Sequence, residues 1–282
     1  MSKLLSANFF RLKRDKIFWI VSAAMLVLSA FSMINNGITA QKYADQNIEN
    51  NVTALESCYF NLMPMIGFFF SVFISLFLGT EYSEGTIRNK LISGHTRTDI
   101  YLSNYVICLV GTEFIYVLFL IAGLVGIPFF GIWKAPISQI IIYTVIGFFI
   151  TASLTAILNM LSMLSTNKAA TAVLSIVLAF ALMIIASSIY NVLAEPETTV
   201  EFISMSADGK VEFGDEIPNP AYVSGLERKI DEWLVQFLPT GQGILAANSE
   251  ISQPVLNIVY SIIIAVIVNI AGIFAFRKKD LK

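Results

Sequence analysis

Six long apolar segments constrain this chain more than any other feature of its sequence. They run over residues 17–34, 60–78, 100–126, 137–161, 169–193 and 255–276. A helix needs about 20 predominantly apolar residues to cross the hydrocarbon core of a bilayer. Backbone groups in lipid must be hydrogen-bonded within the protein, so each segment is predicted to be a transmembrane helix.

Composition agrees with this prediction. Charged residues make up 13% of the 282 residues, against about 25% in a soluble domain. Hydrophobic residues make up 56% and the mean hydropathy is +0.73, so a soluble fold could not bury the apolar surface. The net charge of −2 gives no basic excess that would point to nucleic acid. Two cysteines, Cys58 and Cys108, are too few for a disulfide framework or a zinc site, and we expect unpaired thiols.

The distribution of lysine and arginine predicts the orientation of the spans, because cytoplasmic loops are enriched in these residues. With the N-terminus inside, 13 of the 18 basic residues are cytoplasmic and 5 are external. The inside set is Lys3, Arg11, Lys13, Arg14, Lys16, Arg88, Lys90, Arg97, Lys168, Arg277, Lys278, Lys279 and Lys282; the outside set is Lys42, Lys134, Lys210, Arg228 and Lys229. Both termini are therefore predicted to be cytoplasmic.

The first residues predict a helix that lies in the membrane interface. Leu5, Phe9 and Leu12 share one helical face, and several basic residues lie close by. Such a helix binds anionic lipid before the chain turns into the first span. A plain basic anchor that only sets the topology is the alternative.

Two outer segments are expected, a polar loop over 35–59 and a larger acidic segment over 195–253. In the larger one, two strand-like stretches flank Asp208-Gly209, a pair typical of a two-residue hairpin turn. Ser224 and Glu227 then have the spacing of a capping box at the start of a helix. The apolar face of that helix consists of Leu226, Ile230, Trp233 and Phe237. This face is expected to cover the outer ends of the spans, or alternatively to dip into the outer leaflet.

The expected fold class is an all-α integral membrane protein with six transmembrane helices and a small α+β extracellular segment. The chain divides into residues 1–194, with the interfacial helix and five spans, residues 195–253, and residues 254–282, with the sixth span and a basic tail.

The loop between the second and third spans carries the most specific pattern. Residues 83–93 predict a short helix with Ser83 as its N-cap and Gly94 as its stop. Its small apolar face and the flanking basic residues are Ile87, Leu91, Arg88 and Lys90. A short polar helix of this kind suits docking onto another protein.

An ordered set of residues runs through this loop: Glu81, Tyr82, Gly85, Thr86, Ile87, Arg88, Leu91, Gly94 and Arg97, followed by Tyr101. The set resembles the coupling helix of type-2 ATP-binding-cassette (ABC) exporter permeases, and permeases for bacitracin, lantibiotics and multidrug export are the most similar. The resemblance implies that the first nine residues couple the chain to an ATPase subunit. The sequence departs from the pattern near Ser103, where Asn104 stands in place of a basic residue. A loop whose charges only enforce topology is the alternative.

The resemblance extends over the whole chain, including Leu238-Pro239-Thr240-Gly241-Gln242 before the last span, and it implies a transporter made of several chains. The chain itself lacks a P-loop, since Val211 follows its one Gly-Lys pair and Ser204 replaces the leading glycine. We therefore expect no enzymatic activity and no cofactor in this chain. ATP and magnesium would be bound by a separate ABC ATPase subunit, and a second permease chain, identical or related, would complete a dimer. The family makes a bacterial plasma membrane the expected location.

Glu113 is the one ionisable residue deep inside a predicted span. An acid at bilayer depth costs on the order of 3 kcal/mol on translocon scales and usually faces a bundle interior or a wet cavity. It either lines the substrate path or the dimer interface, or is protonated and hydrogen-bonded to a neighbouring polar side chain. Asn159 and Asn269 are further polar candidates inside spans.

The expected function is the permease subunit of an ATP-driven exporter for a hydrophobic or amphipathic substrate, such as an antimicrobial peptide, an antibiotic or a lipid-like molecule. One alternative is a membrane immunity or sensor protein that binds a peptide through its outer segment. Another is an ion-coupled secondary transporter that uses Glu113, although such transporters usually have broken helices and several intramembrane polar groups. An intramembrane enzyme is disfavoured, since the single histidine, His95, lies in a loop.

Overall fold

The computed structural model describes residues 1–45, 55–131, 133–205 and 211–280. The elements, in chain order, are α1 (Ser2–Arg14), α2 (Lys16–Asp45), α3 (Leu55–Tyr59), η2 (Met63–Met65), α4 (Ile66–Ser83), α5 (Thr86–Ile92), α6 (Arg97–Gly123), η3 (Leu124–Gly126), α7 (Ile127–Phe130), α8 (Ile137–Leu164), α9 (Lys168–Ala194), β1 (Thr198–Met205), β2 (Val211–Pro218), α10 (Gly225–Phe237), α11 (Pro239–Ala247) and α12 (Pro254–Lys278).

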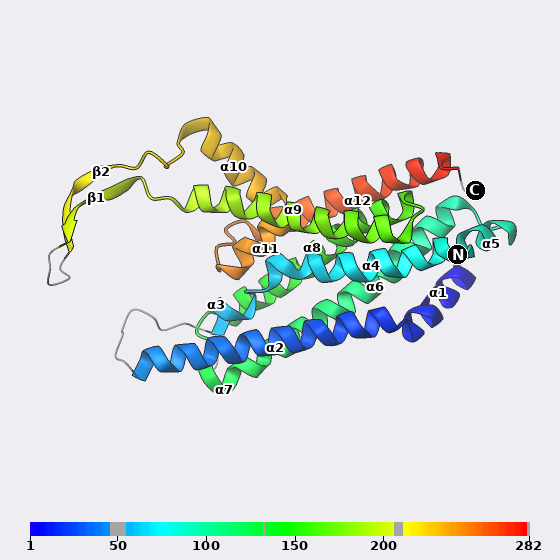
Figure 1. The fold of residues 1–282 in the computed structure, drawn as a ribbon, viewed down its shortest axis with the longest axis horizontal. Coiled ribbons are helices and arrows are strands. Elements are labelled where there is room, and N and C mark those ends of the chain that lie inside the picture. Colours follow the sequence, from blue (N-terminus) through cyan, green and yellow to red (C-terminus); the bar gives the residue numbers. More distant parts are fainter. Residues whose placement is uncertain (46–54, 132, 206–210, 281–282) are drawn as a thin grey trace.

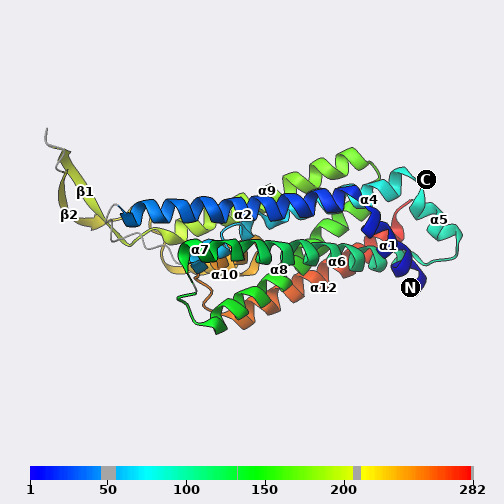
Figure 2. The same cartoon turned by 90° about the horizontal axis from the view of Figure 1, so that it is seen from below.

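The long helices form an elongated bundle (Figure 1). Six of them are long and apolar enough to cross a membrane, which confirms the number and places of the predicted spans. They cover Lys16–Lys42, Met63–Ser83, Arg97–Phe130, Ile137–Leu164, Lys168–Ala194 and Pro254–Lys278. Both chain termini lie at one end of the bundle, together with α1 and α5 (Figures 1 and 2). We call this the terminal end and the opposite one the far end.

The helix of the first span, α2, is longer than predicted. The sequence predicts a polar loop from residue 35, but α2 continues to Asp45. The polar residues after Ile34 include no proline, so nothing removes the backbone donors that continue the helix. Thr39 also donates its hydroxyl to the carbonyl of Asn35 at 2.9 Å, within the helix.

The core of the bundle surrounds α4. In the apolar part of the second span 67% of the residues are buried, against 22% for α9 and 17% for α12, so most of the surface of the last two is exposed on the outside of the bundle. Large aromatic side chains fill the space around α4, including the fully buried Phe70, Phe73, Phe77, Tyr101 and Tyr116. α12 packs along α8, and α9 packs along α4. Cys58 and Cys108 are both buried free thiols, as predicted.

The predicted outer segment contains the two predicted strands. β1 and β2 pair antiparallel, with Met205 opposite Val211. The predicted turn at Asp208-Gly209 lies outside the described residues. Irregularities between Val200 and Ser204 adjust the register further along the ladder.

The amphipathic helix α10 follows the hairpin, but its predicted contacts are only partly present. Ser224 is the N-cap residue, yet its side chain makes no capping hydrogen bond, so the predicted capping box does not form. Leu226, Ile230 and Trp233 are exposed instead of covering the spans. Val235 provides the buried contact. The exposed apolar face agrees better with the alternative of a helix that dips into one leaflet of the bilayer.

The short helix α11 was not predicted, and it is buried along almost its whole length, from Pro239 to Ala246. Gln242 is a completely buried polar side chain in the middle of this mostly apolar helix. Its side-chain amide donates to the carbonyl oxygens of Gln236 (2.8 Å) and Asn257 (3.1 Å) and accepts from the Ser261 hydroxyl (2.9 Å). A buried amide with these partners leaves no unmet hydrogen bond.

Gly241 tests how tightly α11 is packed. A Cβ atom there would collide with the backbone carbonyl of Val235, which cannot rotate away. Gly241→Ala is expected to lower the free energy of unfolding by about 1–3 kcal/mol through overpacking. Gly67→Ala is the matched control, because its Cβ would lie 3.6 Å from the nearest Leu154 methyl group, an ordinary contact. The measurement is the thermal midpoint in mild detergent, and equal midpoints for the two variants would contradict this packing.

Candidate coupling site

The short helix α5 stands between the second and third spans at the terminal end (Figure 1). Its start differs from the prediction, because Ser83 is the last residue of α4 and Gly85 is the N-cap of α5. Gly85 has a φ of 67°, a left-handed conformation that glycine adopts without steric cost. The chain therefore bends sharply between α4 and α5 at Gly85. A helix capped by Ser83, as predicted, would not need a left-handed residue there.

The predicted stop at Gly94 is confirmed. Gly94 has a φ of 84°. Its N–H donates to the carbonyl of Leu91 at 2.9 Å, and the N–H of His95 donates to the carbonyl of Lys90 at 3.2 Å. These two bonds form a Schellman motif, which satisfies the last carbonyls of α5 and turns the chain toward α6.

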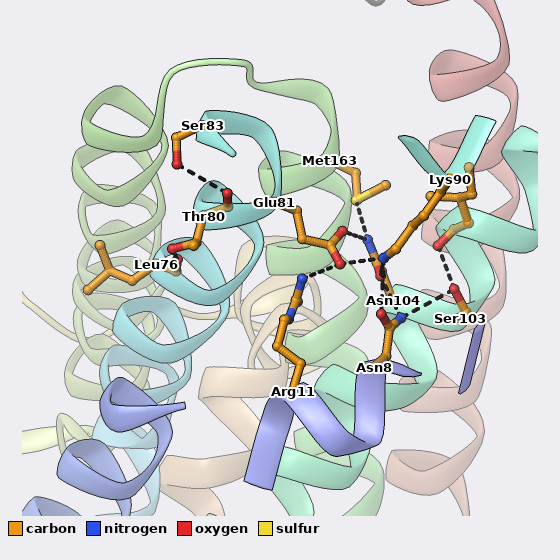
Figure 3. Close-up of polar contacts among 11 residues, drawn as sticks. Asn8, Arg11, Leu76, Thr80, Glu81, Ser83, Lys90, Ser103, Asn104 and Met163 are labelled. Carbon is orange, nitrogen blue, oxygen red and sulfur yellow. Dashed lines mark hydrogen bonds and ion pairs between the residues drawn. The ribbon is translucent and has the colours of Figure 1, made fainter. Parts of the chain in front are cut away.

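A buried carboxylate lies at the base of α5. Glu81, in the last turn of α4, is completely buried and forms ion pairs with Arg11 from α1 and Lys90 from α5 (Figure 3). Asn104 of α6 donates its amide to the second carboxylate oxygen of Glu81 at 2.7 Å. One side chain thereby joins four helices that are separate in the sequence.

Asn8 completes this network from α1. Its amide donates to the Asn104 side-chain oxygen at 2.9 Å, and its own oxygen accepts from Lys90 at 3.0 Å. The buried face of α1 therefore consists of Leu4, Asn8 and Leu12. This corrects the predicted face, since Phe9 is 43% exposed. A buried asparagine belongs to this face because it has polar partners there.

The charges of the network are only partly balanced. Two cations surround one carboxylate, and the Arg11 guanidinium also stacks over the Phe77 ring, 3.8 Å from its centre. Burial lowers the pKa of Lys90, and the adjacent Glu81 carboxylate opposes this shift. Removing the carboxylate would leave two cations facing each other in a poorly hydrated space.

A second cluster ties the end of the chain to the same region. Tyr82 donates its hydroxyl to the carbonyl of Met163, and Lys279 donates to the Tyr82 oxygen at 2.9 Å. Burial lowers the pKa of Lys279 to about 8. Arg97 donates to the carbonyls of Phe276 (3.1 Å), Arg277 (3.2 Å) and Lys279 at the end of α12. A cation at that position also stabilises the negative end of the helix dipole.

The structure therefore gives most of the nine predicted coupling residues internal contacts. Ile87 is buried, Thr86 and Leu91 are half-buried, and among the side chains of the nine only that of Arg88 is exposed. The exposed face of α5 instead contains Arg88, Asn89 and Ile92, of which Ile92 is 78% exposed. Asn89 and Ile92 were missed because Ile87 and Leu91 were assigned to the outward face. Helical spacing alone could have paired Arg88 with Ile92, but not shown which pair faces out.

Comparison with known families decides the identity of the chain. The family model for ABC-2 family transporter proteins matches residues 4–186. The chain belongs to the ABC-2 transporter family. This match spans α1 to most of α9 and so includes the whole Glu81 network and α5. No curated protein matches the chain.

In this ABC-2 protein, Glu113 lies on α6 and is half-buried. Thr151 of α8 donates its hydroxyl to one carboxylate oxygen at 2.6 Å. The other oxygen is buried without a hydrogen-bond partner among the described residues. A hydrogen bond to a neighbouring threonine was one of the predicted alternatives. The second carboxylate oxygen can accept one further hydrogen bond. Asn159 and Asn269 are also inside the bundle, each with an unpartnered oxygen in the described part of the chain.

Glu81 gives the strongest test of the site. Glu81→Gln removes the charge that holds Arg11 and Lys90, and breaking such a buried pair costs about 3 kcal/mol. The thermal midpoint in detergent is therefore expected to fall by several degrees.

The matched control is Glu232→Gln, which breaks the exposed pair of Arg228 and Glu232 within α10. Exposed pairs four residues apart contribute about 0.3–0.5 kcal/mol, so its midpoint should hardly change. A Glu81→Gln protein as stable as this control would show that the network does not hold the four helices together.

Proposed function

We propose that this chain is the permease subunit of an ATP-driven exporter. The observation that carries the proposal is the exposed face of α5, where Arg88, Asn89 and Ile92 project from a helix fixed at its base. Ile92, which is 78% exposed, and the two polar side chains beside it form a surface that a second protein can cover. The partner is a separate ABC ATPase subunit that binds ATP and magnesium.

The terminal end is proposed to be cytoplasmic, in a bacterial plasma membrane. Support comes from the basic residues gathered there on α1, α5, the start of α9 and the end of α12, as the positive-inside rule expects. The ATPase would then bind on the side where ATP is available. A second permease chain, identical or related, would complete the transporter.

The proposed substrate is a hydrophobic or amphipathic molecule, such as an antimicrobial peptide, an antibiotic or a lipid-like compound, as in the bacitracin and lantibiotic exporters. Support comes from the sequence resemblance and from the apolar surfaces of the spans, which give such a molecule access from the bilayer.

Ile92→Ser together with Arg88→Glu is expected to release the ATPase. The double variant removes the apolar contact and reverses the charge on the exposed face, while the Glu81 network stays intact. We expect the ATPase that copurifies with the tagged chain in mild detergent to fall at least about tenfold, which corresponds to about 1.4 kcal/mol of binding free energy.

Ile137→Ser is the matched control, because Ile137 is 61% exposed and begins α8 at the far end of the bundle. Recovery of the same amount of ATPase with both variants would argue against α5 as the docking element. The membrane immunity or sensor protein would then become the better interpretation, since it needs no ATPase.

Glu113→Gln tests the proposed role of the acid in transport. The substitution keeps the size of the side chain and its bond with Thr151 but replaces the ionisable carboxyl group with a neutral amide. If Glu113 lines the substrate path, export of a cationic substrate should fall about tenfold while ATPase copurification is unchanged. Export at the level of the unsubstituted chain would assign Glu113 a structural role. If export by the unsubstituted chain depends on the proton gradient and not on ATP, and Glu113→Gln abolishes it, the secondary transporter would be favoured.

A further inference from the structure

An apolar groove of about 500 Å³ opens on the side of the bundle near the terminal end. It lies where α1, α2 and α6 meet, and Figure 2 shows α1 crossing beside the starts of these two spans. The lining residues are Phe9, Leu12, Lys13, Phe18, Trp19, Val110 and Phe114. Its volume is in the range of ordinary ligand pockets.

The groove is built by the break between α1 and α2. Asp15 accepts a hydrogen bond from the Phe18 N–H at 2.8 Å and thereby fixes the start of α2. The indole N–H of Trp19 donates to the carbonyl of Lys13 at 2.9 Å, which satisfies the end of α1. Because these bonds hold α1 at an angle to α2, their apolar side chains diverge and leave a space against α6.

Aromatic contacts give the groove a fixed wall. The ring centres of Phe18 and Phe114 lie 5.5 Å apart. Those of Trp19 and Phe114 lie 5.9 Å apart in an edge-to-face arrangement. Phe18 and Leu12 form the buried floor, while Phe9, Trp19 and Phe114 remain exposed at the sides. The Trp19 indole is already hydrogen-bonded, so the wall offers its occupant an apolar surface.

Positive charge is concentrated at the rim. Lys13 is the one charged residue of the lining, and its ammonium lies 4.7 Å from the centre of the Phe9 ring. Arg14 and Lys16 are also exposed on this part of the chain. The carboxylate of Asp15, the nearest acid in sequence, is engaged by the Phe18 N–H. An occupant with an apolar chain and an anionic head complements both parts of the groove.

We propose that this groove binds an anionic phospholipid, with an acyl chain between α1 and α6 and its phosphate at Lys13. The two parts of the groove match this ligand, because the apolar lining suits an acyl chain and Lys13 at the rim suits a phosphate group. A bound lipid would hold α1 in the position from which Arg11 reaches Glu81. The proposal does not depend on transport or on an ATPase.

Trp19 provides a direct probe, since it lines the groove and the chain has three tryptophans in all. Trp133→Phe with Trp233→Phe leaves Trp19 as the sole tryptophan. In vesicles titrated with either brominated phosphatidylglycerol or brominated phosphatidylcholine, we expect half-maximal quenching of Trp19 at a several-fold lower mole fraction of the anionic lipid. Lys13→Gln should reduce this preference about fivefold, as expected for one basic side chain near an anionic headgroup.

Lys3→Gln is the matched control, because Lys3 is exposed on the same helix but does not line the groove. Equal loss of preference in both variants would indicate general attraction to the membrane surface and overturn the site. Equal quenching by the two lipids in the unsubstituted background would do the same, since Trp19 would then contact only bulk lipid. Absence of quenching by either lipid would show that a second chain covers the groove, which also overturns the proposal.

Native mass spectrometry of the chain with all tryptophans present gives an independent measurement. Phosphatidylglycerol retained on the protein should fall in Lys13→Gln and not in Lys3→Gln. This comparison serves equally when the single-tryptophan protein does not purify as one species.

Discussion

The buried carboxylate of Glu81 is the interaction on which the terminal end of the bundle depends. A charge without exposure to water is stable only with counter-charges and hydrogen bonds, and here these come from three other helices. The requirement runs in both directions: α1, α5 and α6 must stay close enough to satisfy Glu81, and Arg11 and Lys90 need the carboxylate in turn. The ion pairs and hydrogen bonds of Glu81 therefore fix the positions of these four helices relative to one another at the terminal end.

The Glu81 network changes the interpretation of the loop pattern. The residues that make the loop recognisable are mostly those that build and hold α5: Gly85 and Gly94 define its ends, Ile87 anchors it, and Arg97 and Tyr82 bind the neighbouring helix ends. Of the three residues on the exposed face, Arg88 belongs to the pattern, whereas Asn89 and Ile92 lie outside it. The internal contacts at the base of α5 leave little room for local adjustment between α5 and the helices α4 and α6.

The third span, α6, connects the features described above. Its first turns contribute Asn104 to the network, Val110 and Phe114 line the apolar groove, and Glu113 faces α8. These positions fall on different faces of one helix, so a shift of α6 would alter all of them.

The sequence by itself determined the membrane character, the six spans, the two strands of the hairpin and the end of α5 at Gly94. These features depend on local composition and spacing, because lipid forces every long apolar segment into a helix. Only the tertiary structure decided which face of α5 points out, which face of α1 is buried and which groups pair with Glu81. Helical periodicity shows which residues share a face but not what the face meets, and partners such as Arg11 and Glu81 are 70 residues apart. The hidden helix α11 was missed for the same reason, since its glycine and glutamine become favourable only against the distant groups that pack on them.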